Sequence, residues 1–173
     1  MQFDSRSRWL FAGFAVLAFA LLGEAMVLQH FKGQAPCPLC VLQRAAYVSF
    51  ALIALVAAVQ RPLRRGTVAY LTALTLVALV GAGIAMRHVW VLYHPKFGCG
   101  IDVLEQFVND LPTAKLLPWL FHANGECTAP HAPILGLQVP EWSLIWFGVL
   151  FFGALVFALR SWSALRATAQ SRV

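Results

Sequence analysis

Four long apolar stretches, separated by short polar segments, set the pattern of this chain. They cover approximately residues 9–28, 41–60, 66–88 and 142–159. A helix needs about 20 mostly apolar residues to cross the hydrocarbon core of a bilayer, and each stretch comes close to that length. The pattern therefore predicts an all-α membrane protein, a four-transmembrane-helix bundle that forms a single membrane domain over residues 1–173.

Two loops should lie on the same side of this bundle, at approximately residues 29–40 and 89–141. The longer loop contains IDVLEQFVNDL, in which Ile101, Leu104 and Phe107 recur at helical spacing. This spacing predicts a short interfacial helix along the membrane surface. Packing of the same residues within an ordinary loop is the alternative.

Composition supports the membrane assignment. Hydrophobic residues make up 60% of the chain and charged residues 12%, well outside the range of soluble domains. A cleaved signal peptide is the competing interpretation of the first stretch. It is disfavoured because the apolar run outlasts a signal core of about 7–15 residues. Cleavage would also put the two chain ends on opposite sides of the membrane.

Basic residues predict the orientation. With both termini in the cytoplasm, eight arginines lie on that side: Arg6, Arg8, Arg61, Arg64, Arg65, Arg160, Arg166 and Arg172. The opposite loops hold only Lys32, Lys96 and Lys115. This asymmetry follows the positive-inside rule. It also accounts for the net charge of +6 without a nucleic-acid partner.

The predicted topology puts all four cysteines on the non-cytoplasmic side: Cys37, Cys40, Cys99 and Cys127. Disulfides persist in oxidising compartments such as the bacterial periplasm, so an even number there indicates two bridges. Three pairings are possible, and the residues alone do not select one.

The stretch APCPLCVLQR joins a C-x-x-C pair to an arginine at the start of the second span. Cys37, Cys40 and Arg44 share one helical face, because they are spaced three, four and seven residues apart. An arginine this close to hydrocarbon is costly. A cysteine thiolate or the polar head of a lipid-soluble cofactor would offset that cost; simple snorkelling of Arg44 to the interface is the alternative.

His88 ends the third stretch on the same side as Arg44, so the two side chains could face each other across the bundle. Copper or zinc held by histidines and cysteines is an alternative use of these residues. A four-cysteine zinc site is disfavoured, because Cys99 and Cys127 are far apart whereas structural zinc ligands come in short-spaced pairs. Our prediction is that the chain has no metal site, and a copper or zinc site made of histidines and cysteines stays the alternative.

These residues resemble the DsbB family of bacterial inner-membrane disulfide-bond formation proteins. PCPLCVLQR fits its C-x-x-C-x-x-x-R signature, and the four spans, the loop cysteines and the following ILGLQVPEW agree over nearly the whole chain. Some family members have an acidic residue where this chain has Gln43. That difference leaves the local charge environment open.

The resemblance implies an enzyme, a thiol:quinone oxidoreductase of the bacterial inner membrane with its cysteines on the periplasmic side. It would reoxidise a DsbA-like periplasmic thiol oxidase and pass the electrons to ubiquinone or menaquinone. By position, Cys99 would take electrons from the partner and form a pair with Cys127. Cys37 and Cys40 would reoxidise that pair. Arg44 and His88 would bind the quinone beside Cys40.

Three rival functions stay open. A vitamin K epoxide reductase type of enzyme also uses C-x-x-C chemistry in a helix bundle, although its active dithiol usually comes late in the chain. A membrane metal-handling protein would use the four cysteines as ligands. A structural membrane protein would use the disulfides only to brace its loops.

Overall fold

The computed structural model describes residues 5–97, 101–128 and 133–170. Its four long helices are α1 (Ser5–Lys32), α2 (Pro38–Gln60), α3 (Arg64–Tyr93) and α7 (Val139–Gln170). Each is long and apolar enough to cross a membrane, and the described part of the chain contains no strand. The predicted all-α, four-helix membrane fold is confirmed.

The helices run past the predicted apolar stretches at most of their ends. Apolarity marks only the part of a helix that meets hydrocarbon, whereas the backbone stays helical into polar flanks. α2 begins at Pro38, whose ring already sets a helical φ at the first position. It ends at Gln60, and the next residue, Arg61, takes a left-handed conformation with φ of 48°. Pro62 follows and prevents the helix from continuing.

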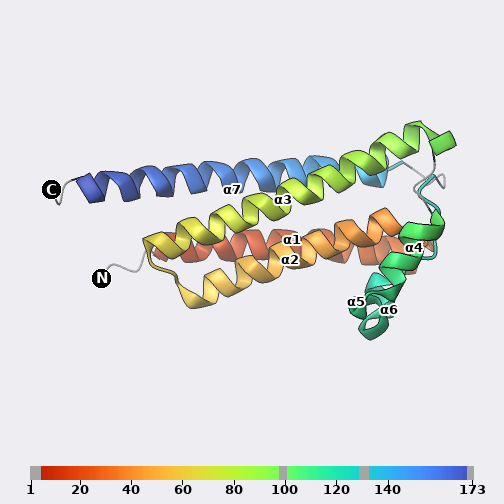
Figure 1. Ribbon diagram of the computed structural model, residues 1–173, viewed down its shortest axis with the longest axis horizontal. Helices are drawn as coiled ribbons and strands as arrows, with labels where there is room; N and C mark the ends of the chain where they lie inside the picture. The colour runs from red at the N-terminus through yellow and green to blue at the C-terminus, as the bar shows by residue number, and fades with distance from the viewer. Residues whose placement is uncertain (1–4, 98–100, 129–132, 171–173) are drawn as a thin grey trace.

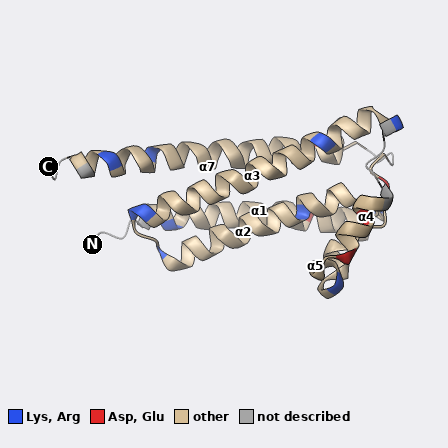
Figure 2. Ribbon diagram, viewed as in Figure 1, with Lys and Arg blue, Asp and Glu red and all other residues tan. Residues whose placement is uncertain are grey.

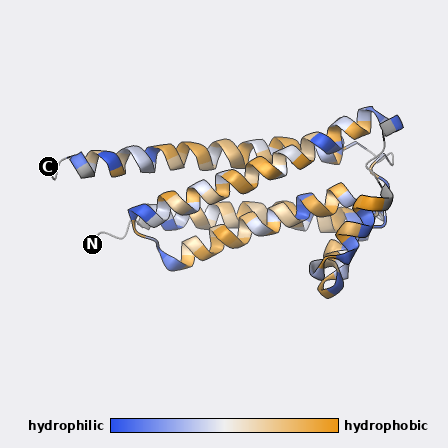
Figure 3. Ribbon diagram, in the orientation of Figure 1, coloured by the Kyte–Doolittle hydropathy of each residue, from blue (hydrophilic) through white to orange (hydrophobic). Residues whose placement is uncertain are grey.

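The helices are arranged in two pairs, with α1 beside α2 and α3 beside α7 (Figure 1). α2 also packs on α3 and joins the pairs. Both termini lie at one end, and the segment between α3 and α7 lies at the other (Figure 1). Hydrophobic residues line the middle of the long helices (Figure 3), and Lys and Arg gather toward their ends (Figure 2).

Large and small side chains interlock in the core between these pairs. Phe147 of α7 is fully buried and stacks on Tyr47 of α2, with ring centroids 4.1 Å apart. On α3, Gly81 leaves the space that the ring needs: a Cβ there would lie 2.3 Å from Phe147 Cε1. Without water to drive helices together, close contact of this kind is a main source of helix association in a bilayer.

Four short helices follow α3 at the cysteine end: η1 (Pro95–Phe97), α4 (Ile101–Asp110), α5 (Pro112–Leu116) and α6 (Pro118–Phe121). The predicted helix is present as α4, and Pro112 and Pro118 divide the chain that follows, since each starts a new helix.

The apolar residues of this segment point in two directions. Val108 is buried in a cluster with Val41 of α2, so α4 docks on the bundle. Phe107 and Trp119 are more than half exposed, at 58% and 55%. An exposed apolar surface beside membrane spans is compatible with the interfacial position, which stays a prediction.

The contact between Gly81 and Phe147 yields a stability test. In a helix interior, alanine is more stable than glycine by about 1 kcal/mol. At Gly81, however, the alanine methyl group would overlap the Phe147 ring. Overpacking of this kind costs about 1–3 kcal/mol. We therefore expect Gly81→Ala to lower the unfolding temperature in detergent micelles, measured by circular dichroism.

Gly83→Ala is the matched control, because it lies on the same helix and a Cβ there meets nothing within 4 Å. It should leave the unfolding temperature unchanged or raise it. Equal effects of the two substitutions would contradict the proposed close packing of α3 on α7.

Candidate redox site at the cysteine end

The C-x-x-C pair forms the start of α2. Cys37 is the residue that caps the helix, and its Sγ accepts a hydrogen bond of 3.2 Å from the Cys40 backbone N–H. The two sulfurs lie 2.7 Å apart, and neither is in a disulfide. A disulfide bond measures about 2.05 Å. The pair can therefore close a disulfide with a small movement of either side chain.

Cys37 is the more enclosed of the two sulfurs, with 1% of the residue exposed. The hydrogen bond to the Cys40 sulfur, and then burial, raise the pKa of Cys37 well above that of an ordinary thiol. Both effects favour the protonated form of Cys37. The two cysteines of the motif are chemically unequal before any partner approaches.

The second loop brings Cys127 to this pair. The backbone N–H groups of Asn124 and Gly125 both donate to the carbonyl of Pro36, at 3.0 and 3.1 Å. Asn109 of α4 holds the same stretch, since its side-chain amide donates to and accepts from the backbone of Ala123, at 2.9 and 2.8 Å. These bonds fix the chain just before Cys127 against the chain just before Cys37.

Cys127 is buried and disulfide-bonded. Its sulfur, the Cys37 sulfur and a ring nitrogen of His88 all lie within 4.8 Å of one another. Cys99 lies outside the described residues. Thus three of the four predicted cysteines meet at one place, and Cys37 is the member of the C-x-x-C pair in the cluster with Cys127.

His88 reaches this cluster from α3. Its Nε2 lies 3.7 Å from Cys37 Sγ, and its Nδ1 lies 3.1 Å from the side-chain amide of Gln43. All three residues are buried. A glutamine amide can donate or accept, so Gln43 orients the imidazole without adding a charge. The sequence left the role of Gln43 open, and the structure gives it a direct partner.

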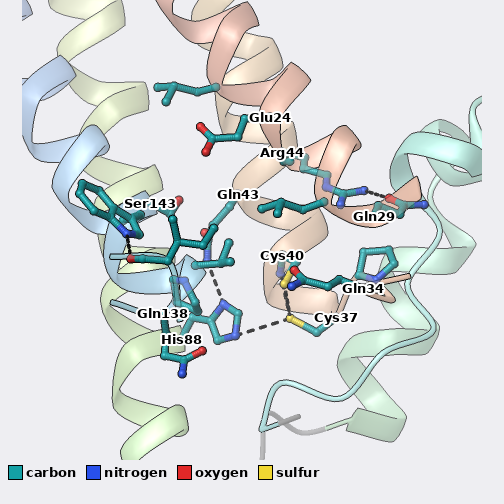
Figure 4. Close-up of a pocket in the computed structure, with 18 of the residues that line it drawn as sticks. Glu24, Gln29, Gln34, Cys37, Cys40, Gln43, Arg44, His88, Gln138 and Ser143 are labelled. Atoms are coloured by element: carbon teal, nitrogen blue, oxygen red, sulfur yellow. Dashed lines mark hydrogen bonds between the residues drawn. The ribbon is translucent and has the colours of Figure 1, made fainter. Parts of the chain in front are cut away.

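Arg44 is buried in the protein, with 6% exposed. Its Nη1 donates to Gln29 Oε1 of α1 at 2.5 Å and to the Leu120 carbonyl of α6 at 3.2 Å. Gln29 in turn donates to the Trp119 carbonyl at 3.4 Å. The cation therefore joins two spans to the loop. Arg44 and His88 line the same cavity from α2 and α3, and each bonds to other partners (Figure 4); that they face each other across the bundle stays a prediction.

This cavity has a volume of about 300 Å³. Its polar lining includes the sulfurs of Cys37 and Cys40 together with Arg44, Gln43 and His88 (Figure 4), and further polar residues, among them Glu24 and Gln29. The rest of the wall is largely apolar or aromatic and includes Leu21, Leu28, Tyr47, Trp142 and Trp146. A cavity of this size and lining suits a small amphipathic ring.

Two lining residues were missed by the sequence reasoning as site residues. Glu24 is a polar position within the first apolar stretch and Gln29 follows directly after it; both line the cavity from α1 (Figure 4). A polar residue inside a span is itself a functional signal. That signal could have selected Glu24, which interrupts the run, although it could not have named Gln29 as the partner of Arg44.

Known proteins resemble this chain along most of its length. The family model described as "Disulfide bond formation protein DsbB" matches residues 7–157. The chain is 45% identical to "Disulfide bond formation protein B" of Herminiimonas arsenicoxydans over 154 residues, 89% of this chain and 96% of that protein. It is 47% identical to the protein of the same name in Cupriavidus necator, over 87% of this chain and 90% of that protein.

The contact between the two loops predicts a specific effect of Gly125→Ala. A Cβ at Gly125 would lie 2.3 Å from the Ala35 carbonyl oxygen, so the loops must separate, at a cost of about 1–3 kcal/mol. In a background of Cys40→Ser and Cys99→Ser, we expect Cys37 and Cys127 to form a disulfide with a mild oxidant. Gly125→Ala should slow this about tenfold, measured by thiol alkylation and mass spectrometry.

Asn124→Ala is the control, because the Asn124 side chain is exposed and its backbone N–H remains. Its rate of disulfide formation should match that of the background. An unchanged rate in Gly125→Ala would mean that this loop contact does not bring the two sulfurs together.

Proposed function

Since the chain belongs to the DsbB family of disulfide bond formation proteins, we propose that it is a thiol:quinone oxidoreductase. It reoxidises a DsbA-like thiol oxidase and passes the electrons to membrane quinone, ubiquinone or menaquinone. The observation that carries this proposal is the position of the C-x-x-C pair. Cys37 meets Cys127 on one side, and both Cys37 and Cys40 line a cavity between membrane spans.

The first exchange takes electrons from the soluble partner. A thiolate of the reduced partner attacks Cys99 in a Cys99–Cys127 disulfide, which forms a mixed disulfide and releases Cys127. The second partner thiol attacks the partner's own sulfur in that bond. The partner leaves as a disulfide, and Cys99 and Cys127 are left as two thiols. Two electrons and two protons have entered the chain.

The second exchange moves the electrons to the C-x-x-C pair. Cys127 attacks Cys37 in a Cys37–Cys40 disulfide; the new bond joins Cys37 to Cys127, and Cys40 is released. Cys99 then attacks Cys127, which restores the loop disulfide and leaves Cys37 and Cys40 as thiols. The separation of at most 4.8 Å between the Cys37 and Cys127 sulfurs supports this route, as does His88, placed to hold or move the Cys37 proton.

The cavity residues fit a quinone head group. Arg44 and Gln43 offer N–H donors beside Cys40, while Trp142 and Trp146 offer flat apolar walls. A bound quinone would accept the two electrons and two protons that the Cys37–Cys40 dithiol loses when its disulfide closes again. The Arg44 charge favours negative charge at a neighbouring sulfur or oxygen, an effect that is strong in an apolar site.

The proposal includes a location. The chain would lie in the bacterial inner membrane with both termini in the cytoplasm and the cysteine end in the periplasm. This orientation is supported by the position of both termini at the end opposite the start of α2, where the C-x-x-C pair lies (Figure 1). The excess of arginine at that end supports the same orientation.

A stoichiometric titration tests the proposed function. The purified, metal-free protein is fully reduced and freed of reductant, and quinone is added under nitrogen. Two disulfides require four thiols and therefore two equivalents of quinone. We expect four thiols to disappear as two equivalents of quinol form, measured by thiol counting and quinone absorbance. No consumption of quinone would favour a metal-handling or purely structural protein instead.

Single cysteine variants separate the two halves of the reaction. We expect Cys40→Ser to lower the rate of quinol formation to the background rate, because the C-x-x-C disulfide can no longer close. Cys99→Ser should abolish oxidation of a DsbA-like partner while Cys37 and Cys40 remain reactive toward quinone. Stopped-flow quinone absorbance measures the first effect, and partner alkylation measures the second. Turnover retained in either variant would overturn these assignments.

A further inference from the structure

We propose that the reduced chain binds one thiophilic divalent cation, Zn²⁺ or a similar d¹⁰ ion, between Cys37, His88 and Cys127. The three donors come from the start of α2, from α3 and from the second loop. Cys40 does not belong to this set. The proposal rests on the proposed function in one respect: in the cell, the partner dithiol of that function would be what reduces the Cys127 disulfide. The site itself is defined by the three side chains alone.

The spacing of the donor atoms fits one ion. They all lie within 4.8 Å of one another. A Zn–S bond is about 2.3 Å and a Zn–N bond about 2.0–2.1 Å, so two donors of one ion are at most about 4.6 Å apart. Small side-chain movements would therefore close the three atoms around a cation, without any rearrangement of the helices.

The chemical types of the three donor atoms, and the residue beside His88, also fit a zinc-like ion. Thiolate and imidazole are the ligands that zinc and related ions prefer. A histidine ligand usually has its other ring nitrogen fixed by a neighbouring polar group. Here the Gln43 side chain lies beside Nδ1 of His88, with Gln43 Nε2 at 3.1 Å, and Nε2 of His88 lies on the side of Cys37. For His88 Nε2 to bind a cation, the Gln43 amide turns over so that its Oε1 accepts from Nδ1–H, which leaves Nε2 unprotonated. Gln43 is thus a positioning residue for the proposed site.

Charge balance selects a divalent ion. All three donor residues are buried, at 1%, 3% and 3% exposed, and a buried net charge is costly. Binding releases one proton from each thiol. Two thiolates and one divalent cation then sum to zero, with a neutral imidazole as third ligand. The adjoining cavity leaves room for a fourth ligand such as water.

The proposed site exists in only one redox state. Cys127 is disulfide-bonded in the structure, and a sulfur in a disulfide is not a thiolate donor. A dithiol that reduces this bond becomes a disulfide itself and leaves Cys127 as a thiol, after which the cation can bind. A bound ion occupies both sulfurs that must join during the second exchange. Thiophilic metal therefore arrests the chain in its reduced form.

The test uses Cd²⁺ as a probe, because its thiolate bonds give an ultraviolet charge-transfer band. The full chain in detergent is reduced, stripped of metal with a chelator and titrated under nitrogen. We expect the band to saturate at one equivalent. Cys127→Ser and His88→Asn should abolish tight binding, and Gln43→Leu should weaken it about 10–100-fold. Circular dichroism checks that each variant keeps its helices.

Cys40→Ser is the decisive control. It removes the other half of the C-x-x-C pair but none of the three proposed ligands, so tight binding should remain. Loss of binding in Cys40→Ser with binding retained in Cys127→Ser would place the ion on the C-x-x-C pair and overturn the proposal, as would the absence of any band. The titration contains neither quinone nor partner, so its failure is distinct from failure of the proposed function.

Discussion

A polar side chain inside a membrane span has no water to bond, so it must find its partner within the protein. At the cysteine end this constraint ties the elements together. Arg44 bonds to α1 and α6, Gln43 bonds to His88 of α3, and Tyr47 bonds to Ser143 of α7. Among the described residues, no buried side-chain nitrogen or oxygen lacks a partner. The bonds that hold the bundle together at this end are therefore the same bonds that shape the cavity.

The two cysteines of the C-x-x-C motif have different neighbours because α2 starts between them. Cys37 precedes the first helical residue and sits beside His88 and Cys127, whereas Cys40 follows one turn later, four residues before Arg44. A single dithiol can thus take part in sulfur exchange with a loop and in transfer to a ligand between spans. The raised pKa of Cys37, which lies beside the loop cysteine, agrees with this division.

The fold and most of the residues of the site could be predicted from the sequence, but only part of the geometry of the site. Apolar runs are local, and so is the helical spacing that puts Cys37, Cys40 and Arg44 on one face. The partners of Arg44 are not local: Leu120 lies 76 residues away in sequence. Its position depends on how α5 and α6 turn at their prolines and on the packing of Gly125 against Ala35. No periodicity encodes such contacts, so the sequence could suggest that Arg44 and His88 share one cavity but could not identify the partners that each of them bonds to.

The bonds of Arg44 bear on whether it can serve the loop and a cavity ligand together. A guanidinium has five N–H donors in a planar fork, and the bonds to Gln29 and Leu120 both start from Nη1. Holding the loop therefore does not exhaust the donors of the side chain. Lysine carries its donors on one nitrogen and lacks this planar fork. A ligand beside Cys40 would meet a cation that the loop already holds in place, so little side-chain entropy is lost when it binds.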